Sequence, residues 1–325
     1  KVYTAQMTPK SNQTASANIS SNSDFKGKER DVIVINNPQT RITNPLPVLD
    51  NTSESVVSAP VSTSDVDIDI PSVGIKNSQT YVVVIANEDY QSEVKVPYAK
   101  NDGKVFAEYC EQVLGVPHEN IDIFENASYN NIRKAVSNAK MFADAAGKNA
   151  RIIFYYAGHG IPDEASCSAY LLPVDGYGSD VTTGYKLDNL YADLGNLPIS
   201  SVTVFIDACF SGSKREGDRL ASARGIAIKV KQGIPVGNMV VFTASSSDET
   251  AYHYKNKSHG LFTYFLLKKL KETQGDVTYD DLFSYIQSNV KMASFQNYRK
   301  IQTPTVKASV QMNNSWKTMK LNKAK

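Results

Sequence analysis

The chain has 325 residues, 41% of them apolar, which is enough for one large α/β domain or two small ones with a sizeable core. Its 35 basic and 33 acidic residues leave a formal charge of +2, which argues against a charge-driven nucleic-acid or anionic-membrane partner. The three cysteines lack CxxC spacing and argue against a disulfide scaffold or a zinc cluster. No apolar run approaches the roughly 20 residues that a membrane-spanning helix needs.

Residues 1–64 form a polar segment that we expect to be a prosegment or a linker. They are rich in Ser, Thr, Asn, Gln and Pro, and Tyr3 and Phe25 are the only aromatic residues among the first 80. Such a composition buries little apolar surface by itself. Within this segment, residues 31–36 predict a short strand. Residues 65–70 alternate polar with apolar side chains, which predicts an edge strand and the start of the main domain at residue 65.

From residue 65 to residue 312, apolar strands alternate with helical patterns. The predicted strands are residues 81–86, 121–124, 151–157, 202–206 and 238–244. The predicted helices, with apolar residues at three- and four-residue spacing, are residues 98–114, 131–145, 261–270 and 279–290. This alternation is typical of an α/β domain with a mostly parallel central sheet flanked by helices. Residues 313–325 are predicted to be a basic C-terminal tail.

Two of the predicted strands are followed by residues that could carry chemistry. The strand at 151–157 leads into Gly158-His159-Gly160, and the strand at 202–206 leads into Asp207-Ala208-Cys209. Because functional groups gather at the carboxyl ends of strands in such sheets, His159 and Cys209 would meet if their strands are neighbours. An imidazole can take the proton of a thiol, and the thiolate is then the nucleophile. We therefore predict a catalytic pair of these two residues.

The flanking residues predict the rest of this site. The backbone amides of Gly160 and Cys209 are natural hydrogen-bond donors to an oxyanion that develops during the reaction. The glycines on either side of His159 are expected to leave room for the backbone of a substrate.

These segments resemble the caspase and metacaspase group of cysteine peptidases over about residues 78–310. In the caspase signature Gln-Ala-Cys-x-Gly, the catalytic His lies about 50 residues before the Cys, and His159 and Cys209 are similarly separated. Residues 81–90, the pair Asn101-Asp102 and residues 260–264 are similar to the bacterial and metacaspase branch. The resemblance implies a caspase-like (caspase-hemoglobinase) fold and a cysteine endopeptidase.

Departures from the animal caspase pattern predict a preference for basic substrates. Asp207 stands where the signature has Gln, and the resemblance puts Asp102 in the same specificity pocket, where animal caspases use Arg to hold an Asp side chain. Two carboxylates would bind Arg or Lys by charge-assisted hydrogen bonds and repel an acidic side chain. Further candidates for this substrate-binding groove are Ser245 and Ser246, with Asp248 and Glu249 in reserve.

Each of these residues also has a purely structural interpretation. Cys209 alone is compatible with a small buried residue at a strand end, and His159 with a turn histidine bonded to backbone. Asp102 is compatible with a charge near a helix N-terminus, and Asp207 with a carboxylate tied to a backbone amide.

We expect no metal site and no required cofactor. Asp175, Asp180 and Asp188 match no EF-hand spacing, although activation by calcium stays open because the resemblance extends to metacaspases, some of which calcium activates. The remaining histidines and cysteines are expected to be incidental: His118, His253 and His259 as surface or capping residues, Cys110 and Cys167 as residues without a partner by spacing.

Residues 213–233 are basic and rich in small side chains, and they predict an exposed loop directly after Cys209. In caspases the corresponding stretch joins the large and small subunits and is cut during activation, so the resemblance implies self-processing here. An ordinary solvated connection is the alternative. Autocleavage candidates in this loop are Lys214, Arg215, Arg219 and Arg224, and similar sites in the N-terminal segment are Lys26, Lys28 and Arg30.

Three other functions stay open. The chain could be a clostripain-like or legumain-like peptidase of the same clan, or a catalytically inactive caspase-like interaction module. A nucleotide-binding or receiver-like module is the weakest alternative, because the sequence has no GxGxxG or P-loop motif. The expected partners are proteins or peptides with basic residues, and not nucleic acid. The chain begins with Lys, so a removed leader, and with it a bacterial exported protein in the periplasm or outside the cell, stays open.

Overall fold

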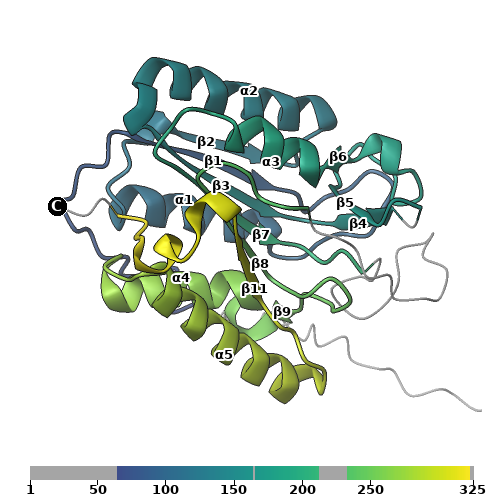
Figure 1. Ribbon diagram of the computed structural model, residues 1–325. Coiled ribbons are helices and arrows are strands. Elements are labelled where there is room, and N and C mark those ends of the chain that lie inside the picture. Colours follow the sequence, from purple (N-terminus) through teal and green to yellow (C-terminus); the bar gives the residue numbers. More distant parts are fainter. Residues whose placement is uncertain (1–63, 164, 212–232, 323–325) are drawn as a thin grey trace, which may run out of the picture. The chain divides into compact units, whose positions relative to one another are not determined.

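The computed structural model describes residues 64–163, 165–211 and 233–322 (Figure 1). The chain divides into two units, Lys1–Val57 and Ser58–Lys325. The first unit, with the strand predicted at 31–36, lies outside the described residues. The second unit holds the α/β fold.

A six-stranded sheet with the order β11-β8-β7-β3-β1-β2 forms the centre of this unit. Five strands run parallel, and β11 pairs with β8 in the antiparallel direction at one edge. The mostly parallel sheet is therefore confirmed, and the five predicted strands have ends shifted by no more than one residue. The bounds are β1 Thr80–Ala86, β2 Ile121–Glu125, β3 Arg151–Ala157, β7 Ser201–Asp207, β8 Met239–Thr243 and β11 Thr305–Ala308.

Helices cover both faces of the sheet, which is why its central strands are apolar along their whole length. In β1, Val82 and Val84 pack into one core, whereas Val83 and Ile85 pack into the other. The first core lies against α1, α4 and α5, and the second against α2 and α3 (Figure 1). The bounds are α1 Ala99–Gln112, α2 Tyr129–Ala146, α3 Leu187–Gly195, α4 Leu261–Thr273 and α5 Tyr279–Tyr298.

The four predicted helices are thus confirmed, and α3 and β11 are additional. Smaller elements lie outside the main sheet. Three short strands form an antiparallel sheet directly after β3, and two pair just before α4. Their bounds are β4 Gly160–Asp163, β5 Ser168–Leu171, β6 Tyr185–Lys186, β9 His253–Tyr254 and β10 His259–Gly260. None of the helices in the described residues combines the length and apolar character that crossing a membrane requires.

The prediction of an edge strand at 65–70 is wrong, because within residues 64–70 the chain forms turns and bends at 65–69 and no strand. We call these residues the N-terminal strap. Its backbone carbonyls accept hydrogen bonds from side chains rather than from a strand: Tyr109 Oη donates to Val66 O at 2.9 Å, and Lys271 Nζ donates to Asp65 O and Ile68 O at 2.7 and 2.6 Å. Val66 is buried while Ile68 is 47% exposed, so the alternation in the sequence does not mark one sheet face.

Residues 313–322, predicted to be part of a tail, pack on the domain. Met319 O accepts a hydrogen bond from Tyr279 N at 2.8 Å, and Lys320 O accepts one from Arg151 Nη2 at 2.6 Å. Leu321 is fully buried. The domain therefore continues at least to residue 322.

Candidate active site

The strands that lead to His159 and Cys209 are hydrogen-bonded neighbours. β3 and β7 run parallel and in register up to the pair Ala157 and Asp207, and Gly158 N donates to Asp207 O at 3.2 Å just beyond it. Both segments therefore leave the sheet at the same end, where the β4–β5 hairpin also lies (right in Figure 1). We predicted that His159 and Cys209 would meet if their strands are neighbours, and the sheet order meets this condition.

His159 is 2% exposed, and Tyr90 and Val94 are among the residues that orient it. Its backbone N–H donates to Tyr90 Oη at 2.7 Å, and the two rings lie 4.7 Å apart. Its Nε2 lies 2.8 Å from the carbonyl oxygen of Val94. Because a carbonyl can only accept, this contact assigns the proton to Nε2, and in the neutral ring Nδ1 is then the nitrogen that can take a proton.

Asp89 and Glu93 both hold the loop that carries Tyr90 and Val94, and Glu93 accepts from Gly178 N at 2.8 Å. Asp89 accepts from Lys95 Nζ at 2.6 Å, from Lys100 Nζ at 2.7 Å and from the side-chain amide of Asn126 at 3.1 Å. Hydrogen bonds from Lys100, Lys95 and Asn126 hold the pKa of Asp89 well below its usual range. These side chains, together with the backbone bond from Val96 N to Glu88 O at 3.0 Å, hold the loop that presents the Val94 carbonyl, and sequence reasoning missed them.

Cys209 is also 2% exposed and lies close to Gly160. A Cβ atom built on Gly160 would stand 2.8 Å from Cys209 O and 2.4 Å from Cδ1 of Phe210, so only glycine fits there. Cys209 also lies near Tyr252: burial raises the pKa of the Tyr252 hydroxyl, and the thiol of Cys209 in its ionised form adds to the rise.

The space beside the two glycines around His159 is filled by the protein itself. A Cβ atom on Gly158 would stand 2.6 Å from Tyr90 Oη and 2.7 Å from Tyr156 Oη. The structure thus explains the presence of these glycines differently from the predicted room for a substrate backbone. They allow tyrosine and phenylalanine side chains to pack directly against the backbone that carries the imidazole.

The two carboxylates of the predicted specificity pocket both bind the start of α4. Asp102, on the first turn of α1, accepts from Gly260 N at 3.2 Å on Oδ1 and 3.0 Å on Oδ2. Asp207, at the end of β7, accepts on Oδ2 from Thr263 N at 3.3 Å and Thr263 Oγ1 at 2.7 Å. Both side chains are fully buried. The structure therefore brings these two carboxylates to one helix N-terminus, on the α1/α4 side of the sheet.

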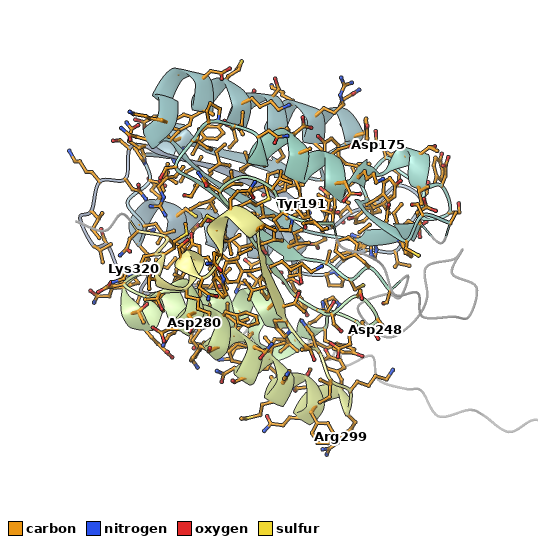
Figure 2. All side chains as sticks on the ribbon, viewed as in Figure 1. Asp175, Tyr191, Asp248, Asp280, Arg299 and Lys320 are labelled. Carbon is orange, nitrogen blue, oxygen red and sulfur yellow. The ribbon has the colours of Figure 1, made fainter. Side chains whose placement is uncertain are left out.

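The remaining predicted groove residues follow β8, the other neighbour of β7. Ser245 is buried and donates to Glu249 O at 3.4 Å, and Ser246 donates to Asp248 Oδ1 at 3.1 Å. The carboxylate of Glu249 accepts hydrogen bonds from Thr303 N at 2.5 Å and from Thr303 Oγ1 at 3.0 Å. Figure 2 shows Asp248 at the right-hand end of the molecule, away from Lys320 at the opposite end.

His259 is the main residue whose environment the sequence did not predict. It is not a surface or capping residue, because its side chain is fully buried and α4 begins after Gly260. Nδ1 contacts Asp102 Oδ1 at 2.7 Å, and Nε2 contacts Asp67 Oδ1 at 2.6 Å. Burial alone would lower its pKa, but the hydrogen bonds to Asp102 and Asp67 outweigh burial and raise the pKa of His259 to about 9.

This shift predicts a dependence of stability on pH. The pKa of His259 rises from 6.5 to about 9 on folding, so its contribution to the free energy of unfolding is complete below pH 6.5 and is lost as pH rises through about 9. Urea unfolding at pH 6.5, 8 and 9.5 should show a loss on the order of a few kcal/mol in the parent that His259→Asn lacks. Equal pH slopes for both proteins would contradict the charged state of His259.

Of the other histidines singled out in the sequence, His253 lies beside this site, because it pairs with Gly260 of β10, whose N–H binds Asp102. His253 is buried too, against the prediction, whereas His118 is exposed beside Glu111. Within residues 64–163, 165–211 and 233–322, no group of three or more His, Cys, Asp or Glu is arranged to hold a metal ion. Asp175, labelled in Figure 2, instead accepts from Tyr129 N at 2.9 Å.

The autocleavage candidates Lys214, Arg215, Arg219 and Arg224 lie outside the described residues, as do Lys26, Lys28 and Arg30. Of the two cysteines predicted to be incidental, Cys110 is fully buried in α1, and burial raises its pKa above the usual range of a thiol. Cys167 lies in the turn between β4 and β5 and is half-buried.

Comparisons with known proteins agree with this fold. The family model described as a caspase domain matches residues 79–314. Among solved structures, caspase-1 from Spodoptera frugiperda is 15% identical, with a TM-score of 0.52 over 76% of this chain and 94% of the other. The protein GSU0716 from Geobacter sulfurreducens is 16% identical, with a TM-score of 0.53 over 74% of this chain and 97% of the other.

The comparison with curated proteins gave no match. At these identities, the two solved structures establish the shared fold. The family model spans most of the chain, and it includes both strand ends that carry His159 and Cys209. The chain therefore belongs to the caspase family, a family of cysteine peptidases.

Proposed function

We propose that this chain is a cysteine endopeptidase that cleaves after Arg or Lys, with Cys209 as nucleophile and His159 as general base. The observation that supports it most is the parallel pairing of β3 and β7, which delivers both residues to one end of the sheet. The hydrogen bond from His159 Nε2 to Val94 O adds the orientation that a base needs.

The proposed reaction uses the protonation state that this contact assigns. Nδ1 of His159 takes the proton from Cys209, and the thiolate attacks the carbonyl carbon of the scissile bond. The backbone amides of Gly160 and Cys209 donate to the oxygen that becomes negative. The imidazolium then protonates the leaving amine, which leaves an acyl-enzyme, and water hydrolyses this thioester in a second round of the same proton transfers.

The proposed specificity rests on charge. Asp102 and Asp207 approach the first residues of α4 from two different elements, and both are buried. A guanidinium or ammonium group next to these carboxylates would gain charge-assisted hydrogen bonds, whereas an Asp side chain would be repelled. Ser245 and Ser246 are proposed to line the same groove. Proteins and peptides with basic residues are thus the proposed substrates.

A peptide panel tests this proposal. The peptides differ only in the residue before the scissile bond, with Arg, Lys, Gln or Asp there, and kcat/KM is measured for each with and without calcium. Arg and Lys peptides should be cut at least about a hundredfold faster than the Asp peptide, as expected for swapping a charge-assisted contact for repulsion. Preferred cutting after Asp would overturn the specificity. No cutting of any peptide would favour an inactive interaction module.

Self-processing is predicted from the same preference. The candidates Lys214, Arg215, Arg219 and Arg224 follow Cys209 closely in the chain, so their effective concentration near the site is high. On incubation, the parent should split between residues 213 and 232 or lose its first few dozen residues, whereas Cys209→Ala should stay whole. Intact-mass spectra of both proteins, with and without calcium, measure this. Identical, unchanged masses would contradict it.

A further inference from the structure

Three ionisable side chains from three separate elements meet in the interior beside the proposed specificity pocket. His259 of β10 lies between Asp102 of α1 and Asp67 of the N-terminal strap, at 2.7 Å and 2.6 Å. The side chains of His259 and Asp102 are fully buried, and that of Asp67 is 18% exposed. Each imidazole nitrogen therefore has its own carboxylate.

The charges of this cluster do not cancel. A protonated imidazole carries +1 and the two carboxylates carry −2, so the cluster keeps one net negative charge. With Asp102 alone, the imidazolium would form a one-to-one pair, which would neutralise the pocket carboxylate. A raised pKa for His259, to about 9, agrees with a ring that is charged at neutral pH.

Among the described residues, the other neighbours of the His259 ring add no net charge. The amide of Asn101 is neutral and donates to Ser258 O at 3.1 Å, and the ring of Tyr264 lies 6.5 Å away. The nearby cation Lys257 is paired with Asp65 at 2.6 Å.

Hydrogen bonds of the N-terminal strap hold Asp67 in place beside His259. Its backbone N–H donates to Ser64 O at 3.0 Å. On either side of it, Val66 O accepts from Tyr109 Oη, and Ile68 O accepts from Lys271 Nζ. The carboxylate of Asp67 is thus delivered to His259 by a segment that α1 and α4 both anchor.

We propose that Asp67 is a positioning residue for substrate specificity: by binding the far nitrogen of His259, it keeps the carboxylate of Asp102 negative toward a basic substrate side chain. This inference rests on the proposed function, because it requires Asp102 to line the pocket. It gives the strap, far from the catalytic pair in sequence, a share in the recognition of Arg and Lys.

The test compares Asp67→Asn with Asp65→Asn in the full chain at pH 6, where His259 is protonated. Asp65 stands on the same strap but pairs with Lys257 and Tyr264, so its variant controls for damage to the strap. The measured quantity is the ratio of kcat/KM for two peptides that differ only in Arg or the uncharged citrulline before the scissile bond. Since both peptides meet the same preparation, this ratio is independent of the fraction of folded enzyme.

Asp67→Asn should lower the Arg/citrulline ratio roughly tenfold, the effect of losing one partly screened unit charge near the site. Asp65→Asn should change the ratio much less, within about twofold of the parent, because the Lys257 ammonium that it releases is partly exposed and is screened by solvent. In Asp67→Asn the ratio should recover by pH 8.5, because the pKa of His259 falls without its second carboxylate and the ring then becomes neutral. If Asp67→Asn does not fold, Asp67→Ser removes the same charge.

The outcomes separate this inference from the proposed function. A parent that does not prefer Arg over citrulline, or cuts neither peptide, would overturn both. A parent that prefers Arg, with the ratio kept in Asp67→Asn or lowered equally in Asp65→Asn, would overturn the role of Asp67 alone. A lowered ratio that fails to recover at pH 8.5 would also overturn it, because the defect would then be structural.

Discussion

Replacing Cys209 by alanine is expected to reduce kcat/KM for an arginyl peptide by at least about a thousandfold, and His159→Ala by a similar factor. The first change removes the proposed nucleophile and the second the proposed base, so each alone stops the reaction. The parent and both variants are compared with one fluorogenic peptide. Residual activity within tenfold of the parent in either variant would remove that residue from the mechanism.

Cys167→Ala is the matched control for these substitutions. Cys167 is half-buried in the turn between β4 and β5, and its loss should leave kcat/KM unchanged within about twofold. Thermal melting separates chemistry from folding. Cys209→Ala should melt close to the parent, whereas His159→Ala loses the contacts to Tyr90 and Val94 and should melt lower.

Asp207→Asn is expected to lower kcat/KM for Arg and Lys peptides roughly ten- to a hundredfold, the usual worth of a hydrogen bond to a charged group. Asparagine keeps the shape of the side chain and can still accept from Thr263, so the change removes mainly the charge. The Gln peptide, which has no charge to lose, should be affected much less. Measuring both peptides with the parent and the variant gives the change in selectivity.

Asp248→Asn distinguishes the two possible locations of the acidic pocket. Asp248 follows β8 and is exposed, and its carboxylate accepts a hydrogen bond from Ser246 Oγ. Its variant should keep the preference for Arg and Lys. If instead Asp248→Asn loses the preference and Asp207→Asn keeps it, the pocket is built from the loop after β8.

The sequence predicts the central strands of the main sheet well because these strands are buried on both faces. Largely apolar runs such as residues 81–86 and 202–206 are too short for buried helices, and the helices between them repeat apolar residues at the right spacing. β4, β5 and β6 are short, and β11 mixes Lys307 with apolar residues at the sheet edge, so no comparable signal marks them.

Only the part of the site that directly follows predicted strands, including His159 and Cys209, could be predicted from the sequence. From the sequence, His159 and Cys209 could be predicted to lie together only if their strands are neighbours. The structure shows that β3 and β7 are neighbours. The Val94 carbonyl has no sequence signature, because every residue carries one. The burial of His259 could not be predicted, because its partners Asp67 and Asp102 lie far away in the chain. In addition, the alternating pattern at 65–70 favoured a strand there.

Covalent labelling of the parent with a tagged acyl-arginyl ketone, followed by peptide mapping, tests the proposed nucleophile most directly. Cys209 should be labelled, Cys167 and the buried Cys110 should stay unlabelled, and labelling should be lost in His159→Ala. The matching acyl-aspartyl ketone should label Cys209 far more slowly, because its acidic side chain is repelled by the proposed pocket. No labelling of Cys209 by either reagent, with and without calcium, would contradict the assignment of this chain as a cysteine peptidase.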